Sequence, residues 1–226
     1  PSPFPLPPYP SPFTSPAHLS SQSGMSADPP KIVRLATLKS PAAFRDHAMA
    51  LGVTIPCDDT LAPASVSPLA QPLTGLRLNG RTPGNRLAIH PMEGWDGTTT
   101  GGVTDDMRRR WRRFGESGAK LVCGGEAMAV RPDGRANPNQ LILSPENRDG
   151  IAELVALCRA AHREHWGDDT DLAIGFQLTH SGRFCRPHSK EWESRVAYRH
   201  PLLDRRFNVT SDTQVLSDED MDALIA

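Results

Sequence analysis

Three short, mostly apolar runs occur in the second half of the chain, at residues 85–92, 119–130 and 171–178. Within each run, apolar residues follow one another instead of alternating strictly with polar ones. Continuous runs of this kind are typical of parallel strands, because helices cover both faces of their sheet. We therefore predict three parallel strands that are buried on both faces.

The segment between the first two runs has the periodicity of a helix. Met107, Trp111 and Phe114 recur at positions i, i+4 and i+7, behind an acidic first turn for which Thr104 is the expected N-cap. In this phase the arginine-rich stretch 108–113 lies opposite the apolar stripe. It is therefore interpreted as a solvated outer face and not as a nucleic-acid surface.

Two further helices are predicted after the second and third runs. Residues 144–165 begin with Ser144 as the expected cap and Pro145 at the first helical position. Four apolar residues share one face of this helix: Ile151, Leu154, Val155 and Cys158. Residues 217–226 open a last helix, for which Ser217 is the expected cap.

The alternation of strands and helices indicates an α/β protein. Three β/α units do not close a barrel, and an open three-stranded parallel sheet leaves its edges bare. The fold is therefore predicted to be a partial (β/α)8 barrel, since a whole one takes about 250 residues. We expect the reading frame to continue past Ala226 with at least five more strand–helix units. Residues 181–215 are predicted to form a long loop that acts as a lid or binds substrate.

The N-terminal part has a different composition. Residues 1–24 are rich in Pro and Ser and lack the features of a secretory signal, so we expect them to be disordered and Met25 to be the native start. Residues 25–72 are expected to form an extension or linker. Residues 73–226 are expected to form the incomplete barrel domain.

Two local elements are predicted around the boundary between these regions. Residues 40–52 favour a short helix, with Ser40 as its cap and Pro41 at its first position. Residues 73–81 favour a hairpin with its turn at Asn79-Gly80.

Composition and charge narrow the class of protein. The chain has 226 residues and a formal net charge of −1, which gives no support for a nucleic-acid or anionic-membrane partner. No stretch is long and apolar enough to span a bilayer. The four cysteines lack CxxC spacing, so they are interpreted as reduced thiols of a cytoplasmic protein.

Candidate chemistry lies where the three apolar runs end. The first run ends in HPMEGW (90–95), the second contains GGEA (124–127), and the third leads into QLTH (177–180). In parallel α/β folds the active site lies at the carboxyl ends of the strands. Glycines at such ends let a ligand approach the backbone closely. The three polar strand ends together predict a binding site.

The same stretches resemble motifs of the Old Yellow Enzyme family of FMN-dependent NAD(P)H oxidoreductases, in the branch of the ene-reductases and 2,4-dienoyl-CoA reductases. The motifs are SPL…LNGRTPGNRLAIHPMEG (67–94), GAKLVCGGEAMAVRPDGR (118–135) and GFQLTHSGR (175–183), in the family's order. The resemblance covers roughly residues 67–226. It implies a flavoprotein that uses FMN as cofactor and NAD(P)H as reductant, and that reduces an activated C=C bond of a small molecule.

The resemblance also implies roles for particular residues. The cofactor-binding set that it implies is Pro91, Met92, Glu93, Ala127 and Gln177. Gln177 would hydrogen-bond the pyrimidine edge of the flavin, since an amide offers both a donor and an acceptor. Glu93 departs from the small or thiol residue that is common at its position. From their places at the strand ends, Trp95, His180 and Arg183 are the expected substrate-pocket residues. Trp95 could alternatively pack under the loop that follows the first strand. His180 and Arg183 could alternatively organise the following loop, and Arg183 could pair with a carboxylate.

Further parts of such an enzyme are expected beyond this sequence. In phosphate-binding barrels the phosphate is usually bound by the loops after strands seven and eight, with help from a helix N-terminus. The 226-residue chain by itself is therefore expected neither to bind FMN tightly nor to catalyse reduction. Whether the complete protein forms a homo-oligomer stays open.

Two alternatives from other classes stay open. His180, Cys185 and His188 belong to residue types that bind zinc, which would suit a metal-dependent barrel hydrolase, although their spacing fits no structural zinc finger. The second alternative is an inactive truncated product, or an interaction module that uses its Pro-rich N-terminus.

Overall fold

The computed structural model describes residues 32–225, so the predictions for residues 1–24 and for a start at Met25 lie outside the described residues. The described part of the chain separates into two compact units, with the division between Leu61 and Ala62. This division falls before residue 73, where the sequence predicts the start of the barrel domain. Within residues 32–225, no helix combines the length and the apolar character that a membrane span requires.

The first unit contains the predicted helix α1 (Pro41–Ala50). The Ser40 hydroxyl accepts a hydrogen bond from the Ala43 N–H at 3.1 Å, and Pro41 occupies the first helical position. This bond satisfies one of the N–H groups that a helix leaves unpaired at its start. Arg45 holds the segment that follows, by donating to the Cys57 carbonyl at 2.7 Å and to the Asp59 carboxylate at 2.8 Å. The predicted helix and its cap are confirmed.

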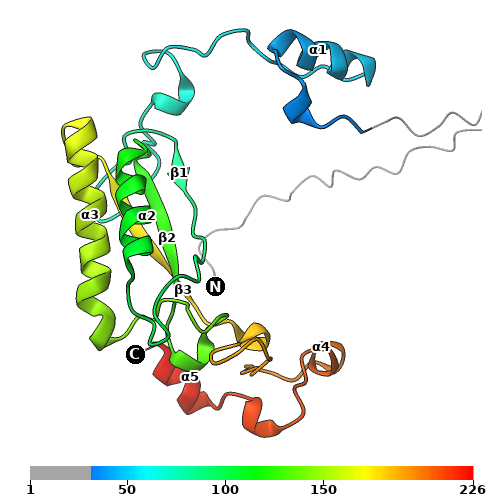
Figure 1. Cartoon of the computed structure of the whole chain (residues 1–226), viewed down its shortest axis with the longest axis vertical. Coiled ribbons are helices and arrows are strands. Elements are labelled where there is room, and N and C mark those ends of the chain that lie inside the picture. The colour runs from blue at the N-terminus through cyan, green and yellow to red at the C-terminus, as the bar shows by residue number, and fades with distance from the viewer. Residues whose placement is uncertain (1–31, 226) are drawn as a thin grey trace, which may run out of the picture. The chain divides into compact units, whose positions relative to one another are not determined.

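The second unit is built on a three-stranded parallel sheet in the order β1-β2-β3 (Figure 1). The strands are β1 (Ala88–Ile89), β2 (Leu121–Ala129) and β3 (Ala173–Thr179). All three fall within the predicted apolar runs or overlap them, although β1 is much shorter than its run. The mixed α/β architecture with parallel strands is therefore confirmed.

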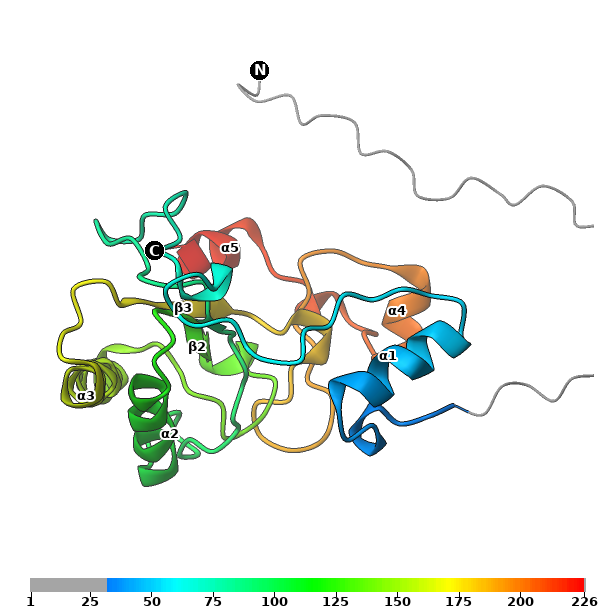
Figure 2. The ribbon, with the colours of Figure 1, turned by 90° about the horizontal axis from the view of Figure 1, so that it is seen from above.

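The helices α2 (Asp105–Glu116) and α3 (Arg148–Trp166) lie side by side against one face of this sheet (Figure 2). The predicted Thr104 cap accepts a hydrogen bond from the Met107 N–H at 3.4 Å. The two helices come close together at Gly115, where a Cβ atom would overlap the Cys158 carbonyl oxygen. Gly115 therefore sets the spacing between α2 and α3.

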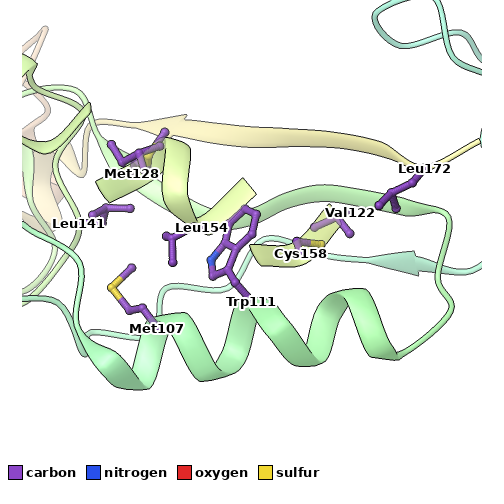
Figure 3. Close-up of a cluster of buried hydrophobic side chains, with 9 residues drawn as sticks. Met107, Trp111, Val122, Met128, Leu141, Leu154, Cys158 and Leu172 are labelled. Carbon is purple, nitrogen blue, oxygen red and sulfur yellow. The ribbon is translucent and has the colours of Figure 1, made fainter. Parts of the chain in front are cut away.

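The core lies between this helix pair and the sheet, and Trp111 projects into it from α2 (Figure 3). The Trp111 ring is fully buried and packs against Phe114 and Phe176, with ring centroids 5.7 Å and 5.1 Å away. The buried cluster consists of Met107, Trp111, Val122, Met128, Leu141, Ile151, Leu154, Cys158 and Leu172. The apolar faces predicted for both helices are thus confirmed.

Burial of the sheet on both faces is wrong for the part of the chain that the structure describes. Val122 and Ile174 point toward the helices, as members or neighbours of the core cluster. Their alternating neighbours point to the other face, because successive side chains of a strand point to opposite sides. On that face Ala88, Cys123 and Gln177 are exposed. The apolar runs did not reveal this difference, because these positions carry small or only mildly polar side chains.

The predicted hairpin and the predicted start of α3 differ from the structure. The hairpin at 73–81 is reduced to a single antiparallel bridge between Leu78 and Arg81, around a turn with positive φ at Asn79 (50°) and Gly80 (77°). The start of α3 is also shifted. Residues Pro145–Asn147 form a 3-10 turn, and Ser144 makes no side-chain cap hydrogen bond.

The segment after β3 is not the plain loop predicted for residues 181–215. It contains the helix α4 (Pro201–Arg206), and α5 (Asp218–Ile225) follows it (Figure 1). The segment also has a small core of its own, formed by Val196, Phe207 and Val209 with Val215 packed against it. Ser217 caps α5 as predicted, by accepting from the Asp220 N–H at 3.1 Å.

Candidate functional site at the strand ends

The carboxyl ends of the three strands converge at a bulge in β2. The pairing of β2 with β3 is regular up to Cys123 and resumes at Ala127, which pairs with Gln177. Within the bulge, Gly124 has a φ of 65°, a conformation that L side chains rarely adopt. A Cβ atom there would lie 2.9 Å from both the Gln177 nitrogen and the Pro91 Cβ. Gly124 thus lets Pro91 and Gln177 lie close together. This agrees with the prediction that the strand ends meet.

Gln177 and Ala127 are neighbours with different surroundings. The Gln177 side chain is exposed, whereas Ala127 is buried. The Ala127 carbonyl accepts a hydrogen bond from the Gln140 amide at 3.1 Å. Among the described residues the Gln177 amide makes no hydrogen bond, so it can meet a ligand directly, whereas the Ala127 backbone is held in place by Gln140.

Gln140 is a site residue that sequence reasoning missed. Its side chain is only 1% exposed. The amide nitrogen lies 3.1 Å from acceptors on all three strand ends: Glu93 Oε1, the Ala127 carbonyl and Thr179 Oγ1. The amide oxygen accepts from the Ala136 N–H at 2.7 Å. The only sequence signal was a polar residue directly before the apolar run 141–143, and it was too weak to single out Gln140.

The end of the first strand carries an organised carboxylate. Glu93 accepts a hydrogen bond from the Trp95 indole N–H at 2.6 Å in addition to the one from Gln140. Trp95 itself has a φ of 51° and remains 45% exposed. Met92, between Pro91 and Glu93, is 76% exposed. Met92 and Trp95 are therefore open to solvent at this end, and the hydrogen bond to Glu93 fixes the orientation of the Trp95 indole.

The interpretation of the arginine-rich stretch 108–113 as a solvated face is wrong for Arg110, which is largely buried. Its guanidinium binds Asp96 and donates to Glu126 at 2.5 Å. The Glu126 side chain is only 3% exposed and also accepts from the Gly94 N–H at 3.2 Å. Burial raises the pKa of Glu126 above its usual range, against the opposing attraction of Arg110. This network ties α2, the bulge of β2 and the end of β1 together beneath the site.

His180 follows β3 and packs against the loop after β2. A Cβ atom at Gly134 would lie 2.5 Å from the His180 ring. The ring Nδ1 accepts from the Gly182 N–H at 3.2 Å, and the buried Nε2 has no hydrogen-bond partner among the described residues. Burial lowers the pKa of His180, so the neutral ring is favoured. His180 thus lies next to the strand ends and also anchors the following segment.

Arg183 has the loop-organising contacts that the sequence left open as an alternative. It donates to the Asp204 carboxylate at 2.8 Å and to the Tyr198 carbonyl at 2.7 Å. Both charged side chains of the pair are about nine-tenths buried. Arg183 therefore joins β3 to α4, and its charge is already matched by a carboxylate.

The three residues of the metal-hydrolase alternative lie in different surroundings. Cys185 is fully buried, and burial raises its pKa to about 11, which disfavours the thiolate that binds zinc. His188 instead pairs with Glu193 at 2.8 Å on the surface. Within residues 32–225, no group of three His, Cys, Asp or Glu side chains is placed to hold a metal ion. The four cysteines all carry free thiols.

Substitution of Gly124 tests whether the bulge brings the strand ends together. Gly124→Ala is expected to cost about 1–3 kcal/mol of unfolding free energy, because it combines an unfavourable positive φ with overpacking against Pro91 and Gln177. Gly175→Ala in β3 is the matched control, since its Cβ would meet nothing within 4 Å. Urea denaturation checks both variants. Equal stabilities for the two would show that the close approach at Gly124 is not tight.

Comparison with known proteins gives matches only among solved structures. No family model and no curated protein matches the chain. The Old Yellow Enzyme from Pichia sp. AKU4542 matches at 19% identity and a TM-score of 0.43, over 54% of this chain and 29% of that chain. The old yellow enzyme from Trypanosoma cruzi matches at 20% identity and a TM-score of 0.42, over 60% and 38%. The homologue from Zymomonas mobilis matches at 21% identity and a TM-score of 0.41, over 52% and 29%.

The family that the sequence motifs resemble is thus also the family of these solved structures. The chain spans well under half of the length of each of them.

Proposed function

We propose that the carboxyl ends of the three strands bind the isoalloxazine ring of FMN, in an oxidoreductase that uses NAD(P)H to reduce an activated C=C bond of a small molecule. The flavin supplies the hydride chemistry when it is bound, and the chain orients it. The observation that carries this proposal is the exposed Gln177 amide, held beside the Ala127 backbone and the Pro91 ring by the bulge at Gly124.

The chemistry of these groups fits the ring. The pyrimidine edge of a flavin alternates carbonyl acceptors with an N–H donor, and the Gln177 amide can complement both from one side chain. Pro91 and the exposed Met92 offer apolar contact for a flat aromatic surface. The uncovered face of the sheet at Cys123 and Gln177 leaves room for such a ligand.

The charges near the strand ends favour recognition of the ring and not of the phosphate. Arg110 is paired with Asp96 and Glu126, and Arg131 binds Asp133 at 2.9 Å. Cations that are already paired with carboxylates contribute little further attraction to a phosphate. We therefore expect FMN and riboflavin, which differ only in the phosphate, to bind this chain with equal and weaker than micromolar affinity.

Replacement of Gln177 by Leu tests the proposal. The variant loses the hydrogen bonds to the pyrimidine edge, which should cost about 1–3 kcal/mol, or roughly a 5- to 150-fold loss of affinity. Flavin fluorescence during titration with FMN and with riboflavin measures the effect. Leu178→Ala is the control, because Leu178 is exposed on the other face of β3 and should leave the affinity unchanged.

Two results would contradict the proposal. One is unchanged flavin affinity in the Gln177→Leu variant, which would show that its amide does not face the ring. The other is tighter binding of FMN than of riboflavin by a large factor, which would show a phosphate site among these residues.

A further inference from the structure

Gln140 lies outside the strands, yet its side chain contacts the ends of all three. It belongs to the connection between β2 and α3, and its amide nitrogen reaches Glu93, the Ala127 carbonyl and Thr179 at 3.1 Å each. Thr179 in turn donates from its hydroxyl to the Met128 carbonyl at 3.1 Å. One buried side chain thereby links the end of β1 to neighbouring positions of β2 and β3.

The orientation of the Gln140 amide is determined by its partners. Its oxygen faces the Ala136 N–H donor at 2.7 Å, and its nitrogen faces the Ala127 carbonyl and the Glu93 carboxylate. A flipped amide would place oxygen against oxygen and N–H against N–H. The nitrogen has two protons for three acceptors, so any shift of one strand end redistributes the hydrogen bonds to the others.

The loop that carries Gln140 is itself held in place. The buried Arg135 guanidinium donates to the Thr99 carbonyl at 2.9 Å and to the Pro138 carbonyl at 2.6 Å. Asn139 donates from its amide to the Gly97 carbonyl at 2.9 Å, and the Gly97 N–H donates back to the Asn139 carbonyl at the same distance. These hydrogen bonds fix the backbone on both sides of Gln140.

We propose that Gln140 is a positioning residue that sets the spacing of the three strand ends, and with it the fit of the flavin ring against Glu93, Ala127 and Gln177. The proposal rests on the proposed function. Gln140 touches the groups assigned to the ring, and it acts through them: Glu93 and Ala127 by direct hydrogen bonds, and Gln177 through its pairing with Ala127.

Three variants of the 226-residue chain test this role. Gln140→Met keeps the length of the side chain and removes its hydrogen bonds, so FMN affinity should fall at least tenfold. Gln140→Glu keeps the acceptor for Ala136 but sets a carboxylate against Glu93, and should lose at least as much. The double variant Glu93→Gln/Gln140→Glu reverses the polarity of that pair and restores a donor between the two positions. It should recover part of the affinity that Gln140→Glu alone loses.

FMN titration is combined with a readout that needs no ligand, namely the backbone amide chemical shifts of the free protein. In Gln140→Met, shifts should change at residues 93–95, 127–129 and 177–180 together. Leu154→Ala is the control for loss of stability, because Leu154 is fully buried in α3, in the core cluster. It should leave FMN affinity unchanged while the protein remains folded.

The outcomes separate the two proposals. If the wild-type chain binds FMN and folded Gln140→Met binds it within twofold as well, the positioning role is overturned. If the wild-type chain binds no flavin, the proposed function fails. The backbone amide shifts then test the positioning role of Gln140 by themselves. Changes at all three strand ends would then support the positioning role, whereas changes confined to residues 134–142 would overturn it.

Discussion

Replacing Arg110 by Met is expected to lower the free energy of unfolding by about 3–5 kcal/mol, because it leaves the Glu126 carboxylate buried without its counter-charge. Glu126 retains a hydrogen bond from Gly94, but a single N–H cannot offset the desolvation of a carboxylate that is only 3% exposed. Urea denaturation at pH 7 measures the loss. Arg112→Met on the same helix is the matched control. Arg112 is half exposed and pairs with surface carboxylates, so its loss should cost less than about 1 kcal/mol.

The pH dependence of the Arg110→Met variant checks the cause of the loss. Burial already raises the pKa of Glu126, and removal of Arg110 should raise it further. A carboxyl with a raised pKa in the folded state binds its proton more tightly than in the unfolded state, so stability falls as pH rises above the unfolded pKa. The variant should therefore be least impaired near pH 4–5, and Glu126→Gln should rescue it at pH 7. A loss that is independent of pH would point to packing instead of charge.

Trp111→Ala is expected to destabilise the protein by about 3–5 kcal/mol, the range for removal of a large aromatic side chain from a core. Trp111 is fully buried and packs against Phe114 in α2 and Phe176 in β3. Its removal therefore opens a cavity between helix and sheet. Trp111→Phe should cost less, since the indole N–H has no hydrogen-bond partner in the described part of the chain.

Trp166→Ala provides the control for Trp111. Trp166 is 54% exposed at the end of α3, and its indole N–H donates to the Glu116 carbonyl at 3.1 Å. Its loss should cost about 1 kcal/mol, the typical value of one hydrogen bond. Thermal or urea unfolding of both variants makes the comparison. Similar losses for Trp111 and Trp166 would show that the helix pair is not held on the sheet by the buried indole.

The helices and strands could largely be predicted from the sequence, because their signals are local. Caps at Ser40, Thr104 and Ser217 act over three residues, and all three make the expected hydrogen bonds. The apolar stripe likewise predicted α2, and the three apolar runs predicted the three strands. Ser144 was the exception: the Pro145–Asn147 turn is 3-10, so α3 begins only at Arg148.

The candidate site could be predicted only in part. The positions of Pro91, Ala127 and Gln177 at neighbouring strand ends followed from the order of strands in a parallel sheet. The partners of the polar side chains did not follow. Arg110 lies three residues after Met107 and four before Phe114, so it borders the apolar stripe, and only the position of Glu126 in β2 makes its burial favourable.

By itself the sequence determined the type, order and approximate bounds of the elements, since capping and apolar periodicity act between residues three or four positions apart. The tertiary structure alone decided which polar groups are buried and which sheet face is covered. Gln140 bonds to groups 47, 13 and 39 residues away, and Arg183 finds Asp204 21 residues further on. Such pairings depend on how distant segments pack, because a polar side chain is stable in the interior only where a complementary group meets it.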